Sequence, residues 1–363
     1  MRCVRAVALS WLGLGSGCWV TYVAGTHDDA SGGADGSGSS SAATSDASSG
    51  AGDLGGDCEL PQPDPSCDAF ADPLRAFELA CYPGVAAATF QSSDGAAWRR
   101  AHEFGNAFFA PRFGDALLVL GTGVLAEAAA GGQVSQAIGA AEPGTANTNP
   151  DDASLPAPIV IEAGSNDGAG GAPFFDCDGV GDCSDTLAQA WTDGGPAHDL
   201  LWWSVDVAVP DAAGHFAIDL AWLSAEFPER IGDAANDTFV VWLSSEAFTG
   251  NVATVQGRRL DTTSLAGLML AHRGDDPMLL RTGFDGGTEL PCELDGATVP
   301  SCPRGATTGW LTLRAPVHGG ETATIVAALF DQGDALLDSV LLLDHFRWGC
   351  EPCTPGGDCG VVP

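Results

Sequence analysis

The chain has 363 residues and is strongly acidic, with 48 acidic against 14 basic residues and a formal net charge of −34 at pH 7. All 14 basic residues are arginines, which excludes lysine-dependent chemistry such as the phosphate-binding loop and Schiff-base catalysis. A basic surface for nucleic acid or anionic lipid is also excluded, because phosphate groups bind to cationic surfaces. We therefore expect no nucleic-acid partner.

The N-terminus has the pattern of an export signal. A cationic start, MRCVR, is followed by a short apolar core, AVALSWLGLG, and by the small-residue stretch GSGC, which ends at Cys18. The apolar run is too short to span a bilayer. Residues 1–18 resemble a bacterial lipoprotein signal, in which Cys18 is lipidated and becomes the mature N-terminus. Cleavage as an ordinary signal peptide is the alternative.

The cysteine content agrees with export. Of twelve cysteines, Cys3 lies in the signal and Cys18 would carry the lipid, and the remaining even number predicts disulfide bonds. Cys177–Cys183 and Cys292–Cys302 are the predicted local pairs, because each closes a short loop that contains Gly, Asp or Pro. The stretch CEPC at 350–353 lacks a second ligand pair, which favours disulfides over zinc. The disulfide candidates are Cys177, Cys183, Cys292, Cys302, Cys350 and Cys353.

Residues 19–57 are rich in Gly, Ser and Asp, and from residue 25 onward they contain almost no apolar side chain larger than alanine. Such a segment cannot bury enough apolar surface to offset the entropy lost on ordering. It is therefore predicted to be a flexible linker that holds a folded domain away from a membrane.

The folded domain is predicted over residues 58–353, followed by a C-terminal tail at 354–363. Its first part predicts one or two short helices. The stretch DPLRAFELACY, residues 72–82, offers an aspartate cap, a proline in the first turn and an apolar face. The stretch DGAAWRRAHEFG, residues 94–105, predicts the second helix.

Strand patterns dominate the remainder of the domain. Apolar residues alternate along LLWWSVDVAV and HFAIDLAWL, so that Trp203 and Trp222 are expected in the core. Strands in series without crossover helices predict a mainly antiparallel β-sandwich of jelly-roll type. The predicted strands are 115–125, 157–164, 200–209, 215–223, 238–244, 309–317, 322–332 and 338–348.

An acidic connection, SAEFPERIGDAAND at residues 224–237, joins two of the predicted strands. Glu226, Asp233 and Asp237 are candidates to converge as oxygen ligands for a hard cation such as calcium. Two of these carboxylates would alternatively serve glycoside hydrolysis. A solvated turn whose Asn and Asp side chains cap the backbone is the structural alternative, because such residues are common in turns.

A second acidic stretch, DCDGVGDCSD at residues 176–185, alternates aspartate with glycine as calcium-binding loops do. It is not an EF-hand, because Val180 stands where a third ligand is expected and no glutamate follows at position twelve. A short disulfide loop with surface aspartates is the alternative. The calcium candidates in this stretch are Asp176, Asp178, Asp182 and Asp185.

The stretch AWLSAEFPERIGDAANDTFVVWLSSEAFTGNVATV, residues 221–255, resembles the central signature of choice-of-anchor L domains. The closing stretch DSVLLLDHFRWGCEPC is similar to the closing strand of that family, with His345 where asparagine is more usual. The resemblance covers roughly residues 105–350. It implies a β-sandwich at a bacterial surface, attached through varied anchoring devices, and no transferable catalytic residues. The signature positions are Ser224, Glu226, Phe227, Pro228, Glu229, Asn236, Asp237, Gly250 and Asn251.

The sequence thus predicts an exported binding or adhesion module that has no catalytic activity, is stabilised by calcium and is anchored to the outer membrane or cell surface by its N-terminal lipid alone. Its expected partner is an extracellular glycan or protein. Two alternatives stay open: a secreted polysaccharide hydrolase that uses the carboxylates of residues 224–237, and a purely structural envelope protein. A secreted or periplasmic location is the alternative to the lipid-anchored one.

Overall fold

The structure is a computed structural model of the chain. It describes residues 58–64, 67, 72–126, 147–151, 154–161, 185–271, 276–285, 292–294, 297–299, 305–333, 335–354 and 357–363. Cys18, the predicted linker, the two predicted local disulfides and the side chains of the 176–185 calcium candidates lie outside the described residues.

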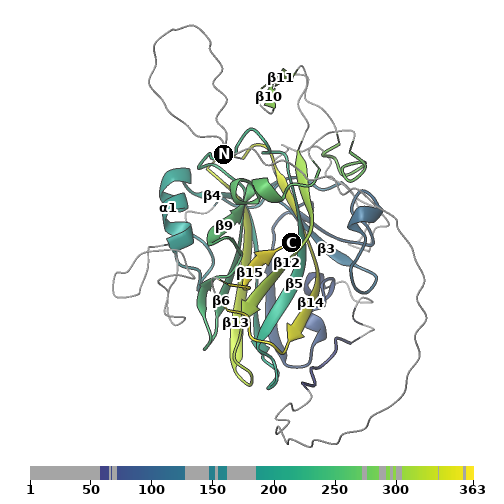
Figure 1. The fold of residues 1–363 in the computed structure, drawn as a ribbon, viewed down its shortest axis with the longest axis vertical. Helices are drawn as coiled ribbons and strands as arrows, with labels where there is room; N and C mark the ends of the chain where they lie inside the picture. Colours follow the sequence, from purple (N-terminus) through teal and green to yellow (C-terminus); the bar gives the residue numbers. More distant parts are fainter. Residues whose placement is uncertain are drawn as a thin grey trace, which may run out of the picture. The chain divides into compact units, whose positions relative to one another are not determined.

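Two antiparallel sheets pack face to face, which confirms the predicted mainly-β sandwich (Figure 1). The first sheet has the order β1 (Val85–Gln91), β4 (Ala197–Ala208), β13 (Thr322–Gln332), β6 (Thr238–Ser244), β9 (Arg258–Asp261) and β8 (Thr254–Val255), with β7 (Thr249–Asn251) paired to β6. The second has the order β15 (Gly360–Val362), β12 (Ala306–Pro316), β5 (His215–Ser224), β14 (Ser339–Gly349), β3 (Leu117–Gly121) and β2 (Trp98–Ala101). A separate pair joins β10 (Cys292–Leu294) and β11 (Ala297–Val299).

The main core lies between the two sheets and follows from the alternation of apolar residues in the strands. Trp203 of β4 and Trp222 of β5 are both buried there, as predicted. Side chains of β13 and β14 with the same period complete the layer, because successive residues of a strand point to opposite faces.

The outer faces of both sheets are also covered, which explains why several strands are apolar on both sides. The helix α1 (Asp185–Gly194) packs Leu187 and Trp191 against the first sheet. Phe104, Phe109 and Phe284 cover part of the second sheet. Continuous apolar runs such as VLLL in β14 are therefore buried on both faces.

Three local predictions differ from the structure. Residues 98–101 form strand β2 instead of a helix, because they pair with β3 and Trp98 packs on Phe90 of β1. Among the described residues of the predicted strand at 157–164, no strand is formed. The stretch 72–82 forms two 3-10 turns, Pro73–Arg75 and Leu79–Cys81, and Asp72 caps the first as expected.

The remaining helical elements are single turns that lie beside the sheets: η4 (Ala107–Phe109), α2 (Thr262–Leu265) and η5 (Ala266–Leu268). In the part of the chain that the structure describes, no helix has the length and apolarity needed to cross a bilayer. The residues expected to form a tail contribute β15, which pairs with β12 at the sheet edge. The sandwich therefore continues beyond Cys353.

Three disulfides are present among the described cysteines: Cys58–Cys350, Cys67–Cys81 and Cys353–Cys359. Cys350 and Cys353 are both disulfide-bonded, as predicted, but not to each other. Cys350 bonds to Cys58, and Cys353 bonds to Cys359. Cys58–Cys350 joins the start of the domain to the end of β14, which closes a loop across a sequence separation of 292 residues.

Candidate functional site

Strand ends from both sheets bring acidic residues together at one end of the sandwich. Residue Ser224 ends β5 and pairs with Ser339 of β14, while Thr238 begins β6 and pairs with Phe330 of β13. The connection between β5 and β6 is the acidic stretch singled out in the sequence. Its carboxylates therefore lie next to the end of β13 and the start of β14.

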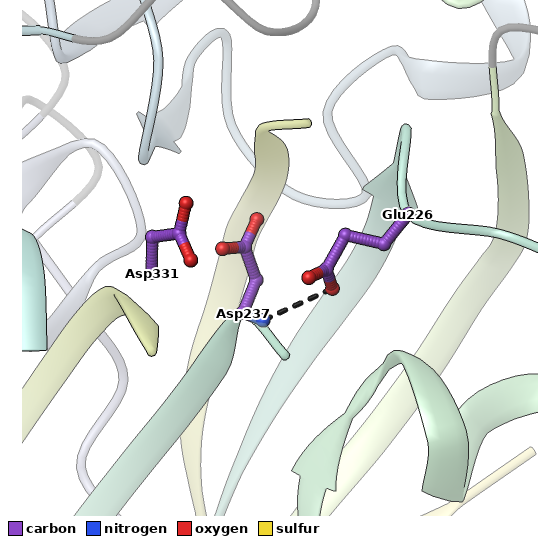
Figure 2. A group of neighbouring side chains, drawn as sticks. All are labelled: Glu226, Asp237 and Asp331. Atoms are coloured by element: carbon purple, nitrogen blue, oxygen red, sulfur yellow. Dashed lines mark hydrogen bonds between the residues drawn. The ribbon is translucent and has the colours of Figure 1, made fainter. Parts of the chain in front are cut away.

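Glu226, Asp237 and Asp331 form a buried carboxylate cluster, with ligand atoms that all lie within 4.8 Å of one another. Figure 2 shows the Asp237 carboxylate between the other two side chains. The three residues are 2%, 0% and 1% exposed. Two were predicted from the sequence, but Asp233 is not part of the cluster. It lies on the surface and pairs with Arg230 at 3.0 Å.

Hydrogen bonds position the carboxylates of Glu226 and Asp237. The backbone N–H of Asp237 donates to Glu226 Oε2 at 3.0 Å, and the Thr262 hydroxyl donates to the same oxygen at 2.9 Å. The Thr122 hydroxyl donates to Asp237 Oδ2 at 3.0 Å. The other oxygen, Asp237 Oδ1, has no hydrogen bond of normal geometry from any described residue, although the Ser339 hydroxyl is near enough to act to lower the pKa of Asp237.

The environment opposes ionisation of this cluster. Burial raises the pKa of Glu226 to about 8, although the donors Thr262 and Asp237 N–H act in the opposite direction. Burial also raises the pKa of Asp237 well above its usual value, and the carboxylates of Glu226 and Asp331 raise it further. The cluster therefore needs protons or a cation to offset its charge at neutral pH.

We expect the free energy of unfolding, measured in EDTA, to fall as the pH rises from about 4.5 to about 8. The pKa of Glu226 is raised in the folded chain, so the folded state binds more protons than the unfolded chain in this window. Glu226→Gln should flatten the slope in urea unfolding series at several pH values. It should not abolish the slope, because burial also raises the pKa of Asp199 and of Asp344 to about 7. Exposed Glu246→Gln should leave the slope unchanged, and equal slopes in all three chains would contradict the assignment.

The other signature residues fix the backbone around the cluster. The Ser224 hydroxyl accepts the N–H of Glu226, and Asn236 donates to the carbonyls of Arg230 and Asp233. Asn251 of β7 accepts the N–H groups of Val241 and Ala253, next to Gly250. Pro228 follows a cis peptide bond, and Glu229 is exposed. These residues shape the turn, which agrees with the structural alternative for most of the signature.

Sequence reasoning missed Asp331, which lies 94 positions after Asp237. The available signal was an acidic residue at the boundary of an apolar run. Asp331 lies at the end of the run that forms β13, and Asp237 lies directly before the run that forms β6. Asp338, directly before β14, is 3% exposed and adds negative charge near Asp237. Only the pairing of β13 with β6 shows that these acids belong to one end of the fold.

A second feature is an exposed surface around Trp310 of β12. The Trp310 indole donates to the Phe108 carbonyl at 3.1 Å, and the Arg112 guanidinium carbon lies 6.0 Å from the Trp310 ring centre. Leu270 hydrogen-bonds through its N–H to Thr307, and its side chain lies beside Gly309. We call this region the Trp310 surface; it consists of Phe108, Arg112, Phe113, Leu270, Leu280 and Trp310.

Two buried acids, Asp344 and Asp219, position Arg112 and Phe113 of the Trp310 surface. The Asp344 carboxylate accepts the backbone N–H groups of Arg112 and Phe113. The Asp219 carboxylate lies 3.2 Å from Arg112 Nε and accepts from Arg347 at 2.9 Å. The Phe113 ring stacks on His345, with ring centres 5.1 Å apart. These contacts hold the loop that carries Arg112 and Phe113 against β5 and β14 of the second sheet.

Comparisons of the chain with known protein families, with curated proteins and with solved structures find no match. The resemblance to choice-of-anchor L domains therefore stays a prediction, and the roles of both sites rest on their own geometry.

Proposed function

We propose that the chain is an exported surface module without catalytic activity that binds an extracellular protein through the Trp310 surface. The observation that carries this proposal is the distribution of exposed apolar side chains. Four of the six large apolar side chains exposed among the described residues belong to this surface: Phe108, Phe113, Leu270 and Leu280. Exposed large apolar side chains on neighbouring segments are typical of interaction sites.

The composition of the surface favours a protein partner over a glycan. Aromatic rings, an arginine and aliphatic leucines resemble the centre of protein interfaces, where Trp, Phe and Arg are enriched. Arg112 is also held in position by Asp219 and by the Asp344 contact to its backbone, which lowers the ordering cost of binding.

The buried cluster gives little support to the hydrolase alternative. A polysaccharide has no access to carboxylates that are at most 2% exposed.

Export is supported by the three disulfides, because such bonds persist mainly in oxidising compartments. The expected signal at residues 1–18 and the lipidation of Cys18 agree with this location, as does the surface role implied by the choice-of-anchor L resemblance.

We expect Leu270→Asp and Phe108→Ala to weaken binding of the mature chain to isolated envelopes of its own source cells by about tenfold or more, because interface centres contribute most of the affinity. Sedimentation of the labelled chain with the envelopes measures this. Leu336→Asp is the matched control, since Leu336 is 57% exposed and lies outside the Trp310 surface.

Equal loss in all three variants would contradict a specific role of the Trp310 surface. Protease treatment of the envelopes should abolish binding. If binding survives protease but is lost after glycan removal, the partner is a glycan and the proposed protein partner is wrong.

A further inference from the structure

We propose that Glu226, Asp237 and Asp331 bind one calcium ion between the ends of the two sheets. This inference is independent of the Trp310 surface and of any partner bound there. It gives the sequence-predicted calcium role to a set of ligands that includes Asp331 and excludes Asp233.

The spacing of the carboxylates is close to the spacing that a calcium ion requires. Calcium–oxygen distances are about 2.3 to 2.6 Å, so two ligand oxygens on opposite sides of one ion are about 5 Å apart. The ligand oxygens of the three residues all lie within 4.8 Å of one another. A single ion at their centre would therefore reach all three.

The unsatisfied oxygen of Asp237 points independently to a ligand. Asp237 is 0% exposed, and its Oδ1 has no hydrogen bond of normal geometry from the described residues. Buried polar atoms nearly always have a partner, because the lost hydration is otherwise not replaced. Figure 2 shows this carboxylate directed into the space between Glu226 and Asp331.

Two described arginines near the cluster form ion pairs with other acids, although the Arg230 charge also acts to lower the pKa of Glu226. Arg259 bonds Asp261 at 2.8 Å and also bonds Gln332. Arg230 pairs with Asp233 on the surface. A bound divalent cation would offset two of the three negative charges at the place where the carboxylates meet.

The ligand atoms favour calcium among the common cations. All three are carboxylate oxygens, and the cluster contains no Cys or His ligand of the kind that zinc prefers. Magnesium demands near-ideal octahedral geometry with oxygens at about 2.0 to 2.1 Å, whereas calcium accepts irregular sets of oxygen ligands at longer distances.

Calorimetric titration of the calcium-free chain with calcium at pH 7 measures the number of ions bound. We expect one calcium at the cluster, after incubation long enough for a buried site to equilibrate, and loss of this binding in Asp331→Asn.

Thermal unfolding supplies the second readout. With calcium at a hundred times its dissociation constant, we expect the midpoint to rise by about 5 °C relative to EDTA. Asp331→Asn and Asp237→Asn should lose this rise. In EDTA both variants should keep a cooperative unfolding transition close to that of the wild-type chain, which separates loss of the ion from simple misfolding.

Asp233→Asn is the matched control, since Asp233 lies on the same connection but outside the cluster. It should retain both the rise in midpoint and the binding of one calcium. The proposal is overturned if the wild-type chain shows no rise, or if the rise persists in Asp331→Asn and Asp237→Asn, which would assign calcium to another site. Normal envelope binding without any calcium effect would overturn this inference while leaving the proposed function intact.

Discussion

Replacing both Cys58 and Cys350 by serine is expected to lower the free energy of unfolding by about 5 to 6 kcal/mol. The reason lies in the unfolded chain, where this disulfide closes a loop across a sequence separation of 292 residues. Loop-closure entropy grows with the logarithm of loop length, so this bond restricts the unfolded ensemble more than a short-range one. Urea unfolding of the mature chain at pH 7 measures the loss.

The matched control is the double replacement of Cys353 and Cys359, whose sequence separation is only 6. The same relation predicts a loss of about 2 kcal/mol for so short a loop. Equal losses in the two double variants would show that local strain or packing, and not loop length, determines the contribution of these bonds.

Asp219→Ala is expected to lower the free energy of unfolding by about 3 kcal/mol at pH 7, because it removes a buried partner of several donors. Asp219 is 1% exposed and accepts hydrogen bonds from Thr312 at 2.8 Å and from Arg347 at 2.9 Å. Its loss leaves Arg112 and Arg347 without a shared carboxylate. Both arginines keep partial contact with water, which places the expected loss at the lower end for a broken buried pair.

Asp206→Ala is the control, because it removes a carboxylate from a similar cross-strand hydrogen bond on the protein surface. Asp206 of β4 accepts from Thr324 of β13 at 2.6 Å, as Asp219 of β5 accepts from Thr312 of β12, but Asp206 is exposed. Its replacement should cost less than about 1 kcal/mol, since exposed polar pairs add little. A similar loss in both variants would contradict the role given to burial.

The pH dependence of the Asp219 contribution has the opposite sign to that of Glu226. Burial alone would raise the pKa of Asp219, but hydrogen bonds from His345, Thr312 and Arg347 and the Arg347 charge hold it below its usual value. Its stabilising contribution is therefore complete above pH 3.8 and is lost as the pH falls through the lowered pKa. Acid unfolding of Asp219→Ala should lack this component.

The sequence by itself determined the fold class and most of the long strands. Alternation along LLWWSVDVAV and HFAIDLAWL was sufficient to place Trp203 and Trp222 in the core, because a strand directs successive side chains to opposite faces. The predicted bounds 322–332 coincide with β13. Such patterns are local, so they are readable without knowledge of which strands are neighbours.

Local patterns were insufficient where pairing decides the structure. Residues 98–101 have a composition compatible with a helix, yet pairing with β3 and the contact of Trp98 with Phe90 make them a strand. The strands β8, β9 and β15 have two to four residues, which are too few for a clear period, and β1 contains three consecutive alanines that give little contrast between its faces. Their conformation follows from the neighbours with which they exchange hydrogen bonds.

Only the tertiary structure decided the composition of the acidic site and the pairing of the cysteines. The sequence placed Glu226, Asp233 and Asp237 on one connection, but strand order brings in Asp331 and leaves Asp233 on the surface. Cys58 likewise meets Cys350 because the first described residues lie beside the end of β14. Both outcomes depend on contacts between residues far apart in the chain, and neither adjacency nor periodicity in the sequence encodes such contacts in a readable form.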